Sequence, residues 1–236
     1  RIADMLLHPG EAYEFDGKTR SYPDIKLVYW CGGNPFHHHQ DLNRLVRAWR
    51  RPETIIVNEP WWTATAKFSD IVLPSTTTLE RKDIGASSRD RFILAMDQTI
   101  EPVGDARNDF DIFRGLAQRL GTHEVFTEGR QPEEWLKHIY DRTRQSAAEM
   151  DVTMPSYEDF WEAGHVEVPP PSEPVVMFEG FRKAPEANPL PSPSGKIEIF
   201  SQVVDGFGYD DCPGHAVWRE PVEWLGCTTA QRYPLH

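Results

Sequence analysis

The stretch Ile25–Pro60 has the order strand, glycine turn, helix, strand, and this order constrains the fold more than any other feature of the chain. Its first segment, Ile25–Trp30, is mostly apolar and β-rich, as is typical of a strand buried on both faces of a parallel sheet. Gly-Gly-Asn-Pro at 32–35 predicts a tight turn, residues 41–49 have apolar positions at helical spacing, and residues 54–57 form a second β-branched run. A crossover unit of this kind places ligands at the carboxyl ends of its strands.

Further segments extend this pattern along the chain. Apolar runs at 70–74 and 91–96 predict a third and a fourth strand, and residues 111–120 and 133–143 have the apolar spacing of helices. We therefore expect residues 1–146 to form an α/β dinucleotide-binding domain, or part of one, in which helices flank a Rossmann-like parallel sheet.

Shorter signals occur between these elements. Residues 2–7 have the character of a helix end, Asp16-Gly17 predicts a hairpin turn, and Thr63 is a suitable cap for a short helical segment. The polar run 75–90 is expected to be mostly loop at the strand ends.

The composition changes near residue 147. From there the chain is rich in proline, acidic residues and scattered aromatics, so we expect residues 147–236 to form an irregular, extended segment that leads towards a further domain. Within it, residues 195–200 alternate between polar and apolar side chains like a short strand.

The overall composition excludes several classes of protein. A net charge of −12 and a pI near 5.2 leave no basic surplus to neutralise phosphates, which argues against a nucleic-acid partner. No run of 18 apolar residues occurs, so no membrane span is expected. Three cysteines are too few and too scattered for a disulfide scaffold or a zinc ribbon. Because the sequence starts at Arg1 without a methionine, we expect a piece of a longer protein.

Several residues of the crossover unit are candidates for ligand binding, and each has a plain structural alternative. Gly33 would let backbone amides approach a phosphate, although such turns are common without a ligand. Glu59 ends the second strand, where dinucleotide folds place a carboxylate for ribose, but an exposed strand-end acid is equally typical. Arg81 can clamp a phosphate or simply lie in a solvated loop. Consecutive side chains at 37–39 point in different directions, so these histidines do not predict a metal site.

Motifs for covalent catalysis or for other nucleotide folds are absent. The sequence contains no GxSxG elbow, no P-loop of the GxxxxGK[ST] form and no GxGxxG fingerprint. We identify no catalytic residue. The residues alone therefore indicate nucleotide-type binding by an α/β sheet.

Four longer segments resemble a known family, the molybdopterin oxidoreductases of the dimethyl-sulfoxide reductase type. The similarity is strongest to the branch with trimethylamine-N-oxide reductase and biotin sulfoxide reductase, and it covers nearly the whole chain. The segments are GGNPFHHHQDLNRL at 32–45, NEPWWTATAKFSDIVLPSTTTLER at 58–81, NDFDIFRGLAQRLG at 108–121 and PSPSGKIEIFS at 191–201.

This resemblance implies a molybdenum ion held by two molybdopterin guanine dinucleotides, and reduction of S-oxides or N-oxides by oxygen-atom transfer. The chain resembles one of two related domains that each hold the guanosine end of one dinucleotide. A carboxylate such as that of Asp111 can accept hydrogen bonds from both N1 and N2 of guanine. The positions that match the family's cofactor-binding residues are Gly33, Asn34, His38, Asn58, Glu59, Arg81 and Asp111.

The resemblance also implies what this chain does not contain. The protein ligand to molybdenum is a serine of an N-terminal part, so we expect no metal ligand here and read Cys31 as a packed strand-end thiol. The expected partners are the remainder of the same polypeptide and a small S-oxide or N-oxide, whereas the electron donor and the compartment stay open. We expect the isolated piece to be inactive. The alternative hypothesis is a stand-alone nucleotide-binding or interaction module without redox activity.

Overall fold

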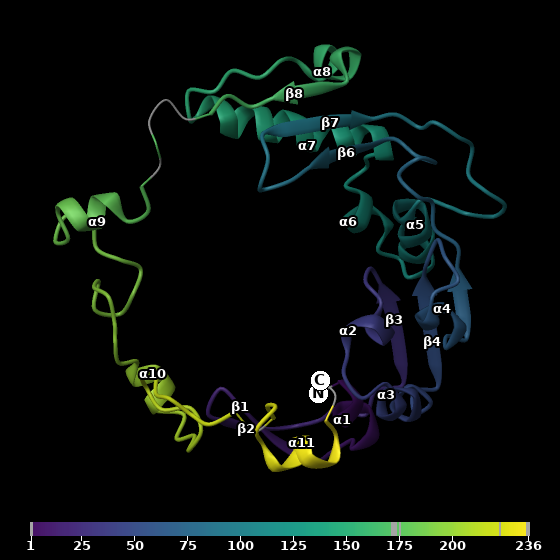
Figure 1. The fold of residues 1–236 in the computed structure, drawn as a ribbon. Coiled ribbons are helices and arrows are strands. Elements are labelled where there is room, and N and C mark those ends of the chain that lie inside the picture. The colour runs from purple at the N-terminus through teal and green to yellow at the C-terminus, as the bar shows by residue number, and fades with distance from the viewer. Residues whose placement is uncertain (1, 171–173, 175, 222, 235–236) are drawn as a thin grey trace. The chain divides into compact units, whose positions relative to one another are not determined.

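A computed structural model describes residues 2–170, 174, 176–221 and 223–234 (Figure 1). Its contacts divide the chain into two compact units. Unit 1 comprises Arg1–Pro9 and Pro23–Pro174, and unit 2 comprises Gly10–Tyr22 and Val175–His236. The expected domain boundary at residue 146 stays a prediction.

Unit 1 contains the parallel sheet that the sequence predicts. The three strands run in the order β3-β4-β5, and both pairings are parallel. Their bounds are β3 (Leu27–Cys31), β4 (Thr54–Asn58) and β5 (Ile71–Leu73). Cys31 pairs with Asn58, and Asn58 pairs with Leu73. The carboxyl ends of all three strands are therefore level with one another, and the predicted α/β class is confirmed.

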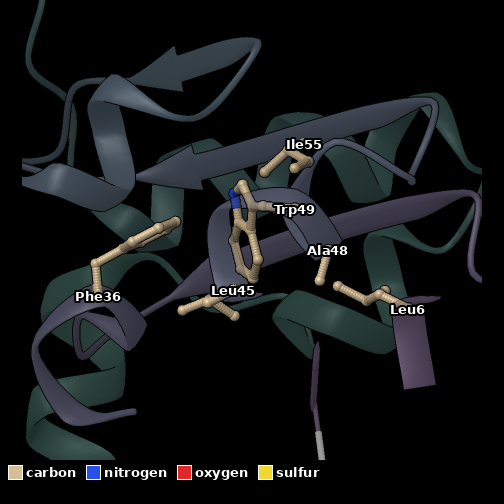
Figure 2. Close-up of a cluster of buried hydrophobic side chains, with 6 residues drawn as sticks. All are labelled: Leu6, Phe36, Leu45, Ala48, Trp49 and Ile55. Atoms are coloured by element: carbon tan, nitrogen blue, oxygen red, sulfur yellow. The ribbon is translucent and has the colours of Figure 1, made fainter. Parts of the chain in front are cut away.

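The first hydrophobic core forms where helix α3 (Leu42–Trp49) packs against this sheet and against α1 (Ile2–Leu7). Apolar residues at helical spacing put Leu45, Ala48 and Trp49 on one buried face of α3. Figure 2 shows the Trp49 indole among the side chains of Phe36, Leu45 and Ile55, with Leu6 beside Ala48. The Phe36 and Trp49 rings meet edge to face, with centroids 5.5 Å apart.

Short helices begin at side-chain caps near the carboxyl edge of the sheet. The Thr63 hydroxyl accepts from the Ala66 amide, which confirms the predicted cap of α4. Asn108 caps α5, so this helix begins two residues before the predicted start. The helices with such caps are α2 (Pro35–His38), α4 (Ala64–Lys67) and α5 (Asp109–Arg119), whereas α6 (His123–Thr127) follows α5 without a side-chain cap.

Unit 1 also contains a second, antiparallel sheet, in the order β6-β7-β8. The predicted strand at 91–96 is β7 (Phe92–Met96), but it belongs to this second sheet and not to the parallel one. Its neighbours are β6 (Asp83–Ala86), which lies inside the predicted loop, and β8 (His165–Glu167), which lies inside the region expected to be irregular. Both are short, and each becomes a strand by pairing with β7.

Helices α7 (Pro132–Ala148) and α8 (Tyr157–Ala163) contribute to the second core, whose buried side chains pack against residues of this sheet. The Tyr140 and Phe160 rings stack with centroids 4.4 Å apart, and both side chains are almost fully buried. Helix α7 begins at Pro132, one residue before the predicted start, and continues to Ala148.

Unit 2 consists of a hairpin and short helices. The hairpin pairs β1 (Ala12–Phe15) with β2 (Lys18–Ser21) across the predicted Asp16-Gly17 turn, where both residues have positive φ, 51° and 67°. The helices are α9 (Glu179–Lys183), α10 (Gln202–Asp205) and α11 (Thr228–Arg232).

The strand predicted at 195–200 is wrong. This segment forms local turns, with Leu190 and Ser192 hydrogen-bonded to Gly195 and Lys196, and no neighbouring strand pairs with it. Ile197 is 72% exposed and Ile199 85% exposed, so the alternating pattern lacks a sheet on which to pack.

Within the described residues, no helix is both long enough and apolar enough to cross a membrane.

Candidate functional site

The carboxyl edge of the parallel sheet is the candidate site. At the end of β3, Gly32 and Gly33 both have positive φ, and a side-chain carbon added at either would meet no atom within 4 Å. The turn is therefore exposed, and its backbone is accessible from solvent. Only glycine adopts this pair of conformations without strain.

Asn34 caps the short helix α2 that follows this turn, and His38 is the last residue of that helix. The Asn34 side-chain oxygen accepts from the Phe36 amide at 3.2 Å and from the Thr65 hydroxyl. This second bond connects the turn after β3 to α4, where Thr65 is fully buried. His38 is exposed in the last turn of α2.

Asn58 ends β4 and is only 6% exposed. Its side-chain oxygen accepts from the Tyr29 hydroxyl at 2.9 Å, and its side-chain nitrogen donates to Asp109 at 2.8 Å. Burial, together with the nearby Cys31 and Asp109, raises the pKa of Tyr29. The Tyr29 phenol therefore keeps its proton at neutral pH and acts as a donor.

Glu59, the next residue, is half-buried and holds the start of α4. Its carboxylate accepts from the Trp61 amide at 3.2 Å and from the Thr63 hydroxyl at 3.1 Å. Both donors belong to one turn, so the Glu59 side chain stiffens the segment that leaves β4.

Arg81 lies in the loop that leaves β5, and its guanidinium is 22% exposed. It forms an ion pair with Asp83 at 3.0 Å and donates to the Thr76 carbonyl at 2.5 Å. These contacts hold the guanidinium within its own loop.

Glu80, which the sequence analysis did not single out, fixes the same loop. One carboxylate oxygen accepts from the Thr77 amide at 2.7 Å and from its hydroxyl at 2.8 Å, and the other accepts from the Val103 amide at 2.6 Å. The hydrogen bonds from Thr77 and Val103 lower the pKa of Glu80. A TLE triplet at 78–80 carries no distinctive signal, because the donor at Val103 is remote in sequence.

A cavity of about 550 Å³ opens beside the end of β5 and one face of α5. The pairing of Ser75 with Arg107 brings the loop before α5 to this edge. Four charged side chains and an apolar floor line the cavity: Leu73, Pro74, Asp105, Arg107, Asp111, Ile112, Gly115, Leu116 and Arg119.

Asp111 is the one predicted cofactor residue among the side chains that line this cavity. Its Oδ1 is buried and lies 2.7 Å from the Arg114 guanidinium as an ion pair, without an aligned hydrogen bond. Arg114 thus neutralises the buried oxygen, while the Asp111 side chain as a whole is 37% exposed, so the carboxylate keeps acceptor capacity for a ligand's N–H groups.

The sequence predicts a packed thiol at Cys31, and this prediction is wrong. Cys31 is exposed at the end of β3. Desolvation and the neighbouring Asp109 raise the pKa of the Cys31 thiol, so it stays protonated at neutral pH. Throughout the described part of the chain, no group of three His, Cys, Asp or Glu side chains is arranged to hold a metal ion.

Comparison with known proteins identifies the family. Residues 9–119 match the family model for molybdopterin oxidoreductase. The chain is 51% identical to a biotin sulfoxide reductase and 50% identical to a dimethyl sulfoxide/trimethylamine N-oxide reductase, both from Cereibacter sphaeroides. It is 46% identical to a trimethylamine-N-oxide reductase from Haemophilus influenzae. Each match covers 100% of this chain, but 32%, 29% and 29% of the respective relatives.

The fold has a counterpart among solved structures. Acetylene hydratase from Pelobacter acetylenicus superimposes with a TM-score of 0.62 over 91% of this chain and 26% of its own, at 22% sequence identity. This likeness concerns the fold alone. The chain spans about a third of the length of the curated relatives it matches, and the family match together with the sequence similarity to these relatives shows that it belongs to the molybdopterin oxidoreductase family.

Proposed function

We propose that the full-length protein is a molybdenum enzyme that reduces S-oxides or N-oxides, and that this chain binds the guanosine end of one molybdopterin guanine dinucleotide. Membership of the family implies a molybdopterin cofactor with molybdenum. The relatives' names supply the substrate class, since they are sulfoxide and N-oxide reductases.

The observation that carries the proposal is the cavity beside Asp111. Guanine presents two adjacent donors, N1–H and N2–H, and a single carboxylate can accept from both, whereas adenine has no such pair. The apolar side chains of Leu73, Ile112 and Leu116 offer a surface for the flat face of a purine.

The neighbouring residues fit the remainder of a nucleotide. The exposed Gly32-Gly33 bend leaves room for a phosphate near the backbone, and Arg107 and Arg119 place positive charge at the cavity wall. In a protein of net charge −12, these two cations would offset the repulsion of an anionic ligand.

When bound, the metal–pterin group supplies oxygen-atom transfer. We assign to this chain the binding and orientation of the nucleotide end. Asn34, His38, Asn58, Glu59 and Arg81 remain proposed cofactor-binding residues; among them, Asn58, Glu59 and Arg81 have contacts that stiffen the strand ends around the cavity.

The alternative, a stand-alone binding module, has less support. The curated relatives are about three times as long as this chain, which spans 32% and 29% of the first two. Ala230 is the one buried hydrophobic side chain among the described residues of unit 2, which therefore lacks a core of its own.

The test is the nucleotide and metal content of the full-length protein. Purified wild-type protein should contain molybdenum and guanine together. Asp111→Asn keeps the shape but replaces one acceptor oxygen with a donor, so we expect about ten- to a hundredfold weaker retention of the guanine nucleotide. Asp141→Asn, on α7, where the side chain is 41% exposed, is the matched control and should retain the wild-type content. Wild-type protein without guanine would refute the proposal.

A further inference from the structure

We propose that Tyr29 is a positioning residue whose hydroxyl, acting through Asn58 and Asp109, sets the first turn of α5 and thereby the location of Asp111. The proposal rests on the proposed function, in which Asp111 faces guanine. It assigns to Asn58 the role of a bridge between elements, in addition to its position at the strand end.

The bridge is a continuous chain of side-chain hydrogen bonds across three elements. The Tyr29 hydroxyl on β3 donates to Asn58 on β4 at 2.9 Å, and the Asn58 amide donates to Asp109 on α5 at 2.8 Å. These bonds join residues 29 and 51 positions apart in the sequence. They therefore hold the helix start against the carboxyl edge of the sheet, where local backbone contacts alone would not.

Burial makes this bridge specific. Asn58 is 6% exposed, so little water reaches its side chain to replace a lost partner. Because the Tyr29 phenol is a donor, it fixes the side-chain oxygen of Asn58 towards β3 and turns the amide nitrogen towards α5. A flipped amide would bring its oxygen against the Asp109 carboxylate, where two acceptors repel each other.

The consequence for the cavity follows from helix geometry. Asp109 and Asp111 belong to the same turn of α5, so a displacement of the first residue moves the carboxylate that lines the cavity. Binding groups need to be held within about 0.5 Å of their productive geometry. Arg114 already pairs with Asp111, so a displaced first turn would change how the carboxylate is shared between this ion pair and a ligand.

The substitution Tyr29→Phe removes the hydroxyl of Tyr29 and keeps its ring. The ring packs against Phe113 of α5 with centroids 5.5 Å apart, and this contact persists in Tyr29→Phe. Tyr140→Phe is a matched control, because the Tyr140 hydroxyl also donates from a buried side chain, to the Pro155 carbonyl at 3.2 Å, in the second core. The two variants lose the same hydroxyl from different parts of unit 1.

The experiment measures backbone amide exchange and guanine retention in the full-length protein. In Tyr29→Phe, peptides spanning residues 108–116 should exchange about tenfold faster, and bound guanine nucleotide should dissociate about five- to tenfold faster during dilution. Tyr140→Phe should leave exchange in residues 108–116 and guanine dissociation at wild-type values. A second variant, Asp109→Ala, removes the other end of the bridge from a half-buried surface and should give the same exchange pattern as Tyr29→Phe.

The outcomes distinguish this inference from the proposed function. Unchanged exchange at 108–116 in Tyr29→Phe, or in Asp109→Ala if Tyr29→Phe does not fold, would overturn the positioning role. Faster guanine loss without faster exchange would also overturn it, because Tyr29 would then contact the ligand itself. Absence of guanine from the wild-type protein would refute the proposed function, while the exchange measurement would still decide whether Tyr29 sets the helix start.

Discussion

Unit 1 and unit 2 differ in how far their hydrophobic side chains are buried. In unit 1, aromatic side chains are buried in two clusters, around Trp49 and around Tyr140 with Phe160. In unit 2, large apolar side chains are exposed, with Trp218 83% exposed and Ile199 85% exposed. A chain segment orders itself only when burial offsets its loss of conformational entropy. Unit 1 therefore contains two cores that can support a binding site, whereas the described residues of unit 2 bury a single hydrophobic side chain, that of Ala230.

The sharpest test of this difference compares one tryptophan from each unit in the 236-residue chain. Trp49→Ala removes a side chain that is 3% exposed, and we expect a loss of about 3–5 kcal/mol in the free energy of unfolding. Trp218→Ala should change it by less than about 0.5 kcal/mol. Urea unfolding followed by circular dichroism measures both. Equal losses would show that unit 2 has a core of its own.

A smaller loss of stability is expected at the carboxyl edge of the parallel sheet in unit 1. Asn58→Leu fills the same space but leaves the Tyr29 hydroxyl and the Asp109 carboxylate without their partner, so we expect a loss of about 1–3 kcal/mol in the free energy of unfolding. Asn188→Leu in unit 2 is the control, because Asn188 is exposed and donates only to the nearby Ala184 carbonyl. If the two variants unfold at the same urea concentration, the bridge contributes nothing to stability.

Glu80 gives unit 1 a dependence on pH. Its folded pKa lies below the ordinary value of 4.5, so the stability it contributes is complete above that value and is lost as the pH falls through the lowered one. Glu80→Gln should therefore lower the melting temperature at pH 7, and the difference from wild type should shrink as the pH approaches 3. Glu162→Gln, at an exposed glutamate of α8, is the control and should leave the melting temperature at pH 7 close to that of wild type. A difference between Glu80→Gln and wild type that is constant from pH 7 to pH 3 would contradict this role.

The comparison also explains which features were predictable. The parallel sheet and its helices could be predicted from local signals, such as the β-branched run of β4 and the Thr63 cap. A strand that is buried on both faces needs apolar residues along its whole length, and such a run can be recognised in the sequence. The segment 195–200 has an equally clear alternation, yet it is no strand, since alternation does not supply a partner. Strands β6 and β8 were missed for the converse reason: each has few residues and is defined by pairing with β7.

The candidate site shows the same limit. Glycines at the turn and a carboxylate in α5 were identified from the sequence, because turn chemistry and family motifs depend on residue type. The bridge from Tyr29 to Asp109 and the contact of Glu80 with Val103 could not be predicted, since their partners are distant in sequence and ordinary in type. Side-chain hydrogen bonds between strand ends can be assigned only when the register of the strands is known, because the register decides which side chains are neighbours.

The smallest predicted effect compares two helix caps. Thr63 caps α4 and Ser201 caps α10, each through a hydroxyl that accepts from a backbone amide, at 3.3 Å and 3.2 Å. Helix α4 buries Thr65 and Ala66, whereas α10 has no buried residue. Thr63→Ala should therefore lower the free energy of unfolding by about 1 kcal/mol, because the cap supports packed residues. Ser201→Ala should cost less than about 0.5 kcal/mol, because its helix contributes little to a core. Thermal unfolding measures both variants, and a larger loss in Ser201→Ala would show that the helices of unit 2 are part of a cooperative structure.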